Sequence, residues 1–200
     1  MRSTVRVAAV VLSLVLSGCA TGGDPVIGAP SVPPTSAGGV PTGDTGGGAG
    51  GTCVPTFPAN TEADTETGSG QILGLRSARV AAQNGYDRVV FELANKGAPG
   101  WEVAYVDAPR SDGSGNPVAV KGEFFLQVLV RHVGTPGDTG VPEPAVRRLT
   151  PTGTLDVTEV VLDGVFEGQY TAFLGLDSER PFRVTRLSSP PRVIVDVRHC

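Results

Sequence analysis

Between residues 71 and 200, apolar side chains alternate with polar ones, so the hydrophobic pattern has a period of two. Turn residues such as Asn84-Gly85 and Pro190-Pro191 separate the runs, which cover residues 89–93, 101–105, 124–130, 157–162, 170–176, 182–187 and 193–197. No stretch sustains the period of an amphipathic helix. Regular short strands with one apolar face are typical of an antiparallel sandwich or barrel. We therefore predict an all-β domain over residues 71–200, an antiparallel β-sandwich of about eight strands.

Two segments of this domain share a spacing of apolar residues. Trp101-x-Val103-x-x-Val106-x-x-Pro109 matches Phe182-x-Val184-x-x-Leu187-x-x-Pro190, and a Val-rich run follows each segment after a proline. This pattern predicts two similar hairpin units related by an approximate twofold. The alternative is a chance match in a Val-rich β protein.

Residues 1–18 have the features of an export signal. A basic start, Met1 to Arg6, precedes an apolar run from Val7 to Leu16, which is shorter than the roughly 20 residues of a transmembrane helix. The sequence Leu16-Ser17-Gly18-Cys19 resembles a bacterial lipobox, in which the cysteine is diacylated and becomes the mature N-terminus. Two acyl chains suffice for stable anchoring. We expect Cys19 to hold the protein at the extracytoplasmic face of the membrane; the alternative is an ordinary signal peptide that happens to contain a cysteine.

Residues 19–70 are rich in Gly, Pro and Thr and contain almost no large apolar side chains. Such a segment buries too little surface to offset its conformational entropy, which predicts a disordered tether. A Gly-rich coil of this length has a mean reach of roughly 40 Å, enough to hold a domain clear of the lipid headgroups. A tuned spacer and a linker without a particular target are both compatible with this composition.

The formal net charge of -4 is unevenly distributed. Residues 20–70 contain five acidic side chains and no Lys or Arg, whereas residues 71–200 contain 14 basic and 15 acidic side chains. The domain is therefore close to neutral. A nucleic-acid binder needs a basic surface, so this composition argues against nucleic acid as a partner.

Two cysteines remain once Cys19 is acylated. Cys53 and Cys200 lie in a chain that is directed to a compartment where disulfides persist. We predict a Cys53–Cys200 disulfide, which the chain-entropy model values at about 4–5 kcal/mol. Free or intermolecular thiols are the main alternative. A metal site is disfavoured, because His199 lacks partners at zinc spacing.

No catalytic, cofactor or metal site is predicted. The chain has two histidines, His132 and His199, and neither belongs to a nucleophile or metal motif. One loop has oxygen ligands at positions 1, 3, 5 and 12 of an EF-hand-like pattern, but Pro117 replaces the glycine needed at position 6; its ligand residues are Asp112, Ser114, Asn116 and Glu123. A polar hairpin turn leading into a strand at residues 118–120 explains the same residues.

Candidate ligand contacts come from aromatic and arginine side chains, because flat rings stack on sugar faces and guanidinium groups bind carboxylates. Trp101 begins a strand after a Pro-Gly turn, and Arg180 and Phe182 occupy the matching place in the second unit. The alternative is that Trp101 belongs to the core. Three further arginines are expected in cross-strand pairs with Glu92, Glu102 or Asp196; they are Arg88, Arg183 and Arg192.

Several runs, in order over residues 72–197, resemble the AMIN-like domains of Gram-positive lipoproteins; they are residues 85–93, 101–106, 113–115, 166–168, 175–177, 180–184 and 191–197. A lipobox and tether in front are usual in that family. The resemblance implies a β-sandwich that is a non-catalytic module of the cell envelope and that in some cases binds peptidoglycan. This chain departs from better-known members because no amidase or secretin region is attached.

Two functions follow from these observations. The first is a non-enzymatic, membrane-anchored lipoprotein whose domain binds a cell-wall component such as peptidoglycan. The alternative is a structural or interaction module that recognises another envelope protein, for example by adding a strand at a sheet edge.

Overall fold

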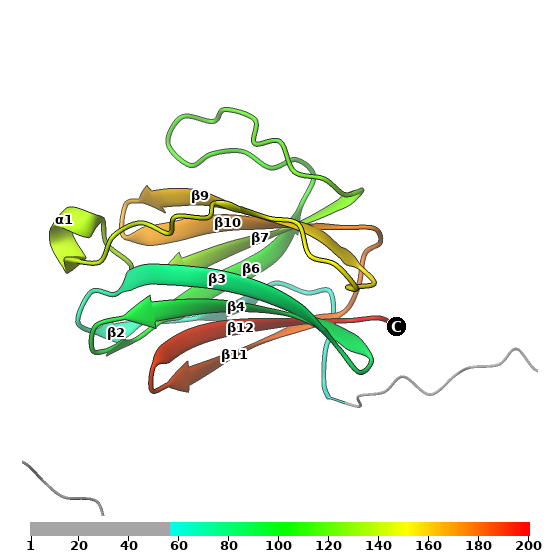
Figure 1. The fold of residues 1–200 in the computed structure, drawn as a ribbon, viewed down its shortest axis with the longest axis horizontal. Helices are drawn as coiled ribbons and strands as arrows, with labels where there is room; N and C mark the ends of the chain where they lie inside the picture. Colours follow the sequence, from blue (N-terminus) through cyan, green and yellow to red (C-terminus); the bar gives the residue numbers. More distant parts are fainter. Residues whose placement is uncertain (1–56) are drawn as a thin grey trace, which may run out of the picture. The chain divides into compact units, whose positions relative to one another are not determined.

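The computed structural model describes residues 57–200, which form two antiparallel sheets packed face to face (Figure 1). The six-stranded sheet has the order β1-β6-β7-β10-β9-β8, and the four-stranded sheet has the order β11-β12-β4-β3. A short ribbon, β2-β5, lies beside them. The strands are β1 (Asp64–Glu66), β2 (Ser69–Gly70), β3 (Gly74–Gln83), β4 (Tyr86–Ala94), β5 (Gly97–Ala98), β6 (Gly100–Val106), β7 (Phe124–Arg131), β8 (Arg148–Leu149), β9 (Val157–Phe166), β10 (Gln169–Leu176), β11 (Phe182–Ser188) and β12 (Pro191–Arg198).

The helical content of this part of the chain is one short helix, α1 (Pro136–Thr139). In residues 57–200, no helix has the length and apolar character needed to cross a membrane. The predicted all-β antiparallel sandwich is confirmed. Eight of the twelve described strands contain seven or more residues, and the other four contain two or three.

The core lies between the two sheets, where the alternating apolar positions point inward. Val89, Phe91 and Leu93 of β4 are buried against residues of the opposite sheet such as Leu126 and Val128 of β7. One continuous cluster of buried side chains draws on both sheets. Burial of a large aliphatic or aromatic side chain contributes about 1.5–3 kcal/mol, so this cluster is the main source of stability.

The strand order has the twofold relation that the repeated apolar spacing predicts. Matching β3, β4, β6 and β7 with β9, β10, β11 and β12, respectively, converts the order β6-β7-β10-β9 into β11-β12-β4-β3. The β3–β4 and β9–β10 hairpins each have a two-residue turn that ends in a glycine with φ of +84°, Gly85 and Gly168. Each sheet therefore contains one hairpin from each half of the domain.

The domain begins earlier than the sequence predicts. Residues 57–70 were expected in the tether, but β1 pairs with β6 and β2 pairs with β5. The indole Nε1 of Trp101 also donates to Asp64 Oδ1 at 2.9 Å. These contacts are made with distant strands, which composition alone does not reveal. The export signal, Cys19 and Cys53 lie in residues 1–56, outside the described residues.

Two strand assignments also need correction. Strand β3 was not predicted, because its small and basic residues alternate only weakly; its pairing with β4 makes it a strand. Conversely, residues 118–120 form no strand, because Val106 of β6 already pairs with Phe125 of β7. Residues 107–123 instead leave the sheet as one long connection, closed within itself by a bridge between Arg110 and Pro117.

Candidate functional site

Residues 107–123 cover the outer face of the six-stranded sheet over β9 and β10. Ser111 donates to Asp163 Oδ1 at 2.8 Å, and Thr171 of β10 donates to Asp112. The carbonyl oxygen of Lys121 lies so close to Gly175 that a Cβ atom there would be 1.7 Å away. Phe173, which points to this outer face between Thr171 and Gly175, is fully buried. This part of the sheet face is therefore closed to a large ligand.

The buried carboxylate of Glu159 anchors this covering segment. Its Oε2 accepts hydrogen bonds from the Lys121 N–H at 2.9 Å and from Arg148 Nη1 at 2.6 Å. Burial raises the pKa of Glu159, but the hydrogen bond from Lys121 and the hydrogen bond and charge of Arg148 outweigh burial, so the net pKa is lowered. The ionised carboxylate is thus the form that holds the segment on the sheet.

We expect the stabilising effect of Glu159 to depend on pH. Because its pKa is lower in the folded than in the unfolded chain, its contribution is complete above the ordinary value of 4.5 and is lost as pH falls through the folded-state pKa. Urea unfolding of the wild-type chain and of Glu159→Gln, measured from pH 7 to pH 3, should show the gap in unfolding free energy closing at acidic pH. A gap that stays constant or widens would contradict this assignment.

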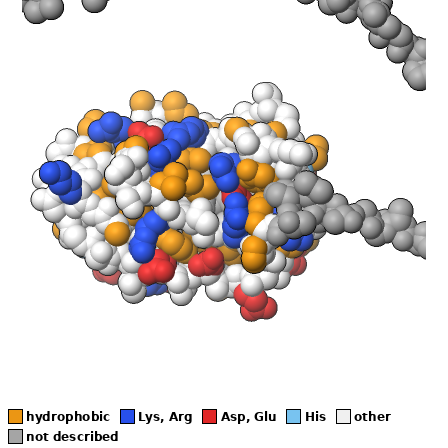
Figure 2. All heavy atoms as spheres, turned by 90° about the horizontal axis from the view of Figure 1, so that it is seen from below, with side chains coloured by type: hydrophobic (Ala, Val, Ile, Leu, Met, Phe, Trp, Pro, Cys, Tyr) orange, Lys and Arg blue, Asp and Glu red, His pale blue; other side chains and the backbone are white. Residues whose placement is uncertain are grey.

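The outer face of the four-stranded sheet is open over much of its area and carries arginines (Figure 2). A shallow groove of about 240 Å³ is bordered by Arg79, Arg88 and Arg192. Its apolar floor includes Val90 and Ile194, and Leu187 at its side is 44% exposed. Figure 2 shows blue basic side chains around orange apolar ones on this side of the molecule. The groove therefore offers positive charge beside an apolar surface.

Asp196, which is fully buried, orients the arginines at one end of this face. Arg88 donates to it from Nε at 2.6 Å and from Nη2 at 2.9 Å, and Arg183 donates from Nε and Nη2 at 3.0 and 2.9 Å. The hydrogen bond with Asp196 raises the pKa of Arg88, so this side chain stays charged. Phe57 covers the end of the face, with its ring 3.6 Å from the Arg183 guanidinium carbon.

The cross-strand pairs expected for Arg88 and Arg183 are thus confirmed, both with Asp196. Arg192 differs from the prediction, because its guanidinium bonds to the carbonyl oxygen of Pro190 at 3.3 Å. Arg79, which was not predicted as a site residue, pairs with Glu92 at 3.2 Å. Arg79 was missed because β3 itself was not recognised as a strand, so its position beside Arg88 and Arg192 was not visible in the sequence.

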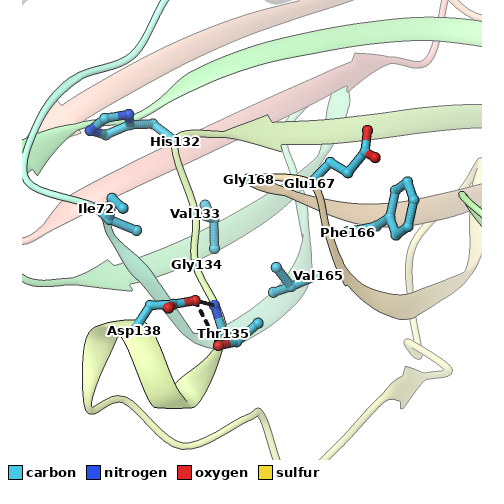
Figure 3. Close-up of a pocket in the computed structure, with 10 residues that line it drawn as sticks. All are labelled: Ile72, His132, Val133, Gly134, Thr135, Asp138, Val165, Phe166, Glu167 and Gly168. Atoms are coloured by element: carbon cyan, nitrogen blue, oxygen red, sulfur yellow. Dashed lines mark hydrogen bonds between the residues drawn. The ribbon is translucent and has the colours of Figure 1, made fainter.

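A second, larger cavity lies at the end of the sandwich, between α1 and the β9–β10 turn (Figure 3). It has a volume of about 540 Å³, and its apolar wall includes Ile72, Val133, Val165 and Phe166. None of its lining residues is a lysine or arginine. His132, at its edge, hydrogen-bonds through Nε2 to the carbonyl oxygen of Gly70 at 2.9 Å. This cavity suits an apolar group and has no feature suited to an anionic polymer.

The aromatic ligand contacts predicted from the sequence are corrected by the structure. Trp101 is only 6% exposed and Phe182 only 2%, and both belong to the core cluster. Phe182 packs edge-on against Tyr105, with ring centroids 6.0 Å apart. Neither ring presents a face for stacking, because the inward-facing positions of β6 and β11 meet between the sheets.

Arg180 is held in the corner before β11. Its Nε donates to Asp156 Oδ1 at 2.8 Å, while its backbone N–H and carbonyl oxygen both hydrogen-bond to the hydroxyl group of Tyr105 at 2.8 Å. Burial raises the pKa of Tyr105, so the hydroxyl keeps its proton for the bond to the Arg180 carbonyl. The rings of Trp101 and Phe182 therefore lie in the core, whereas Arg180, with 32% of its side chain exposed, bonds to Asp156 and Tyr105.

Asp87 accepts several hydrogen bonds that link the two sheets, and nothing in the sequence indicates them. Its buried carboxylate accepts hydrogen bonds from the backbone N–H groups of Leu155, Asp156 and Val157, at 2.8 to 3.3 Å. His199 Nε2 lies 3.1 Å from its Oδ1. The contact ties the four-stranded sheet to the start of β9 in the other sheet.

The polar loop at 112–117 has a structural role as well. Asp112 accepts a hydrogen bond from Thr171, and the Ser114 N–H donates to the Asp112 carbonyl oxygen at 2.9 Å. Within residues 57–200, no three His, Cys, Asp or Glu side chains converge as a metal site would require. These contacts account for the loop as a folded turn that is attached to β10.

In the described sandwich, residues 107–123 lie over β9 and β10, and arginines border the groove on the outer face of the four-stranded sheet. The chain belongs to the AMIN-like domain family, whose model matches residues 73–199. This membership indicates a binding module related to the cell wall or envelope. No curated protein and no solved structure matches the chain.

Proposed function

We propose that this protein is a non-enzymatic lipoprotein of the cell envelope whose AMIN-like domain binds a cell-wall component such as peptidoglycan. The arginine-bordered groove on the four-stranded sheet is the proposed binding surface. Cys19 holds the mature chain at the extracytoplasmic face of the membrane, and the segment that follows lets the domain reach the wall.

The observation that carries this proposal is the arginine-bordered groove on the outer face of the four-stranded sheet. Peptidoglycan combines sugar rings with peptide carboxylates, and arginine binds carboxylates through paired, charge-assisted hydrogen bonds. Arg192 and Arg79 border a groove whose floor, with Val90 and Ile194, is apolar. Such a floor packs against sugar rings and methyl groups while the arginines contact carboxylates.

Removal of Arg192 should weaken wall binding. The test uses the chain from Ala20 to Cys200, which contains the whole described sandwich, in pull-downs with purified, protein-free cell wall. Arg192→Gln should reduce the affinity by about tenfold or more, since a hydrogen bond to a charged group contributes about 1.5–3 kcal/mol. Arg110→Gln is the matched control, because Arg110 lies in the segment that covers the other sheet. No binding by the wild-type chain would refute wall binding. Equal binding by Arg192→Gln and Arg110→Gln would refute the groove as the binding surface.

The anchor and the disulfide can be tested together by mass spectrometry of the full-length protein purified without reductant. We expect a mature chain that begins at an acylated Cys19 and contains no thiol that reacts with an alkylating agent. A chain that begins elsewhere would contradict the anchor. Two alkylated thiols, at Cys53 and Cys200, would contradict the disulfide.

A further inference from the structure

Strand β3 leaves one side of its backbone free at the edge of the four-stranded sheet. β3 pairs with β4, and the residues that flank their two-residue turn, Gln83 and Tyr86, face each other. Backbone groups alternate in direction along a strand. The N–H and C=O groups of Arg79, Ala81 and Gln83 therefore point toward β4, whereas those of Ala78, Val80 and Ala82 point away from the sheet.

Hydrogen bonding elsewhere in the sheet supports this assignment. At the opposite edge, Phe182 of β11 makes both of its backbone hydrogen bonds with Asn60, so it points away from β12. Phe182 lies opposite Val197, Val197 opposite Asp87, and Asp87 opposite Ala82. Because hydrogen-bonded and non-hydrogen-bonded pairs alternate across these strands, the backbone groups of Ala82, and with them those of Val80 and Ala78, point away from β4.

The outward groups of β3 have almost no partners among residues 57–200. The one contact is made by the chain itself, because the Gln83 side chain donates to the Ala82 carbonyl oxygen at 2.8 Å. The other described edges are shorter or occupied. Strands β1 and β8 contain three and two residues, and the β11 edge is engaged by Asn60 at one end and crossed by Arg186, which reaches Pro99.

A groove runs beside this free edge. It has a volume of about 680 Å³, with β3 as one wall and residues 146–152 as the other. Val146 in the second wall is 60% exposed. Arg79 is the one charged residue among those that line the groove. The groove thus combines unpaired backbone groups, exposed apolar surface and the guanidinium of Arg79, which is 54% exposed beside its partner Glu92.

We propose that the edge of β3 is a docking site for a partner protein, which adds an extended segment with alternating acidic and apolar side chains as a further strand. Strand addition satisfies the free N–H and C=O groups, and pockets for alternate side chains give specificity. On the solvent side, acidic residues of the added strand lie beside Arg79. On the other side, apolar residues lie beside Val80 and the wall formed by Val146.

The geometry favours such a segment over two other occupants. The free groups recur at every second residue, about 6.6 Å apart, and span roughly 13 Å from Ala78 to Ala82; a regular strand of L-residues matches this spacing. Cell-wall peptides contain D-residues and γ-linked glutamate, which interrupt that pleat. A second copy of β3 would bring Arg76 and Arg79 of both copies together, and basic residues on an edge oppose such pairing.

Amide hydrogen exchange measured by NMR on the chain from Ala20 to Cys200 tests this site. The probe is an acetylated and amidated Glu-Val-Glu-Val-Glu peptide, used at increasing concentration. The N–H groups of Val80 and Ala82 should exchange quickly in the free protein and about tenfold more slowly with the peptide. The N–H groups of Arg79 and Ala81 already bond to β4 and should change little.

Controls on both molecules separate strand addition from simple charge attraction. A Glu-Val-Pro-Val-Glu peptide and a Lys-Val-Lys-Val-Lys peptide should not protect Val80. Arg79→Gln should weaken the binding of the acidic peptide roughly threefold to fivefold, as for an exposed ion pair, whereas Arg110→Gln should not.

The proposal is overturned if the acidic peptide protects no β3 amide, or if the proline peptide protects Val80 equally well. It is also overturned if peptides released from purified wall by an amidase protect Val80 better than the acidic peptide does. Wall binding through Arg192 is measured separately and can succeed or fail independently.

Discussion

Replacing Asp87 by alanine is expected to lower the free energy of unfolding by about 3–5 kcal/mol, the range seen when one partner of a buried charged network is removed. The carboxylate accepts hydrogen bonds from three consecutive backbone N–H groups, those of Leu155 to Val157, and it contacts His199. In the alanine variant, the N–H groups of Asp156 and Val157 remain buried without an acceptor. Each unsatisfied buried group costs about 1–3 kcal/mol.

Chemical unfolding by urea, followed by tryptophan fluorescence, measures this effect, because Trp101 lies in the core. Asp107→Ala is the matched control, since Asp107 is exposed in the covering segment and its loss should change stability by at most about 0.5 kcal/mol. The stability of Asp87→Asn should lie between those of the two alanine variants, because its amide oxygen can still accept hydrogen bonds from some of the three N–H groups. Equal stability of the Asp87→Ala and Asp107→Ala variants would show that the contact does not hold the sheets together.

Replacing Gly175 by alanine should be the second most damaging change, at about 1–3 kcal/mol, because it overpacks a filled site. The new Cβ would be 1.7 Å from the backbone oxygen of Lys121, which cannot move without lifting residues 119–123 from the sheet. That movement would also break the hydrogen bond between the Lys121 N–H and Glu159.

The matched control is Gly137→Ala in α1, where the nearest atom to a new Cβ is 3.6 Å away. Its effect on stability should be within about 0.5 kcal/mol. Limited proteolysis adds a second readout, because residues 107–123 should become more susceptible in Gly175→Ala alone. Unchanged stability and unchanged proteolysis would mean that the segment does not lie tightly on β10.

The sequence predicts the architecture well where a side-chain pattern determines it. Apolar residues recur at every second position of β4, β7 and β12, because each of these strands has one face in the core, and the repeated spacing around Trp101 and Phe182 agrees with the observed strand order. Strand β3 could not be predicted in the same way. Its Ala and Arg residues have little apolar alternation, and only pairing with β4 makes the segment a strand.

The candidate site was harder to predict than the fold. Aromatic rings suit sugar ligands, which makes Trp101 a candidate contact in the sequence, but its place in the sandwich turns the ring inward. Arg79, Arg88 and Arg192 are far apart in sequence and meet only through the registers of β3, β4 and β12. The covering segment closes the outer face over β9 and β10, and its position depends on tertiary contacts such as the hydrogen bond from the Lys121 N–H to Glu159.

The central claim is that the open face of the four-stranded sheet binds the cell wall. NMR chemical-shift mapping with soluble, uncrosslinked peptidoglycan fragments tests it most directly. We predict saturable shifts confined to the groove, at Arg79, Arg88, Leu187, Arg192 and Ile194, with none at the cavity near Val133 and Val165. Shifts centred on that cavity, or no shifts at millimolar fragment, would contradict the claim.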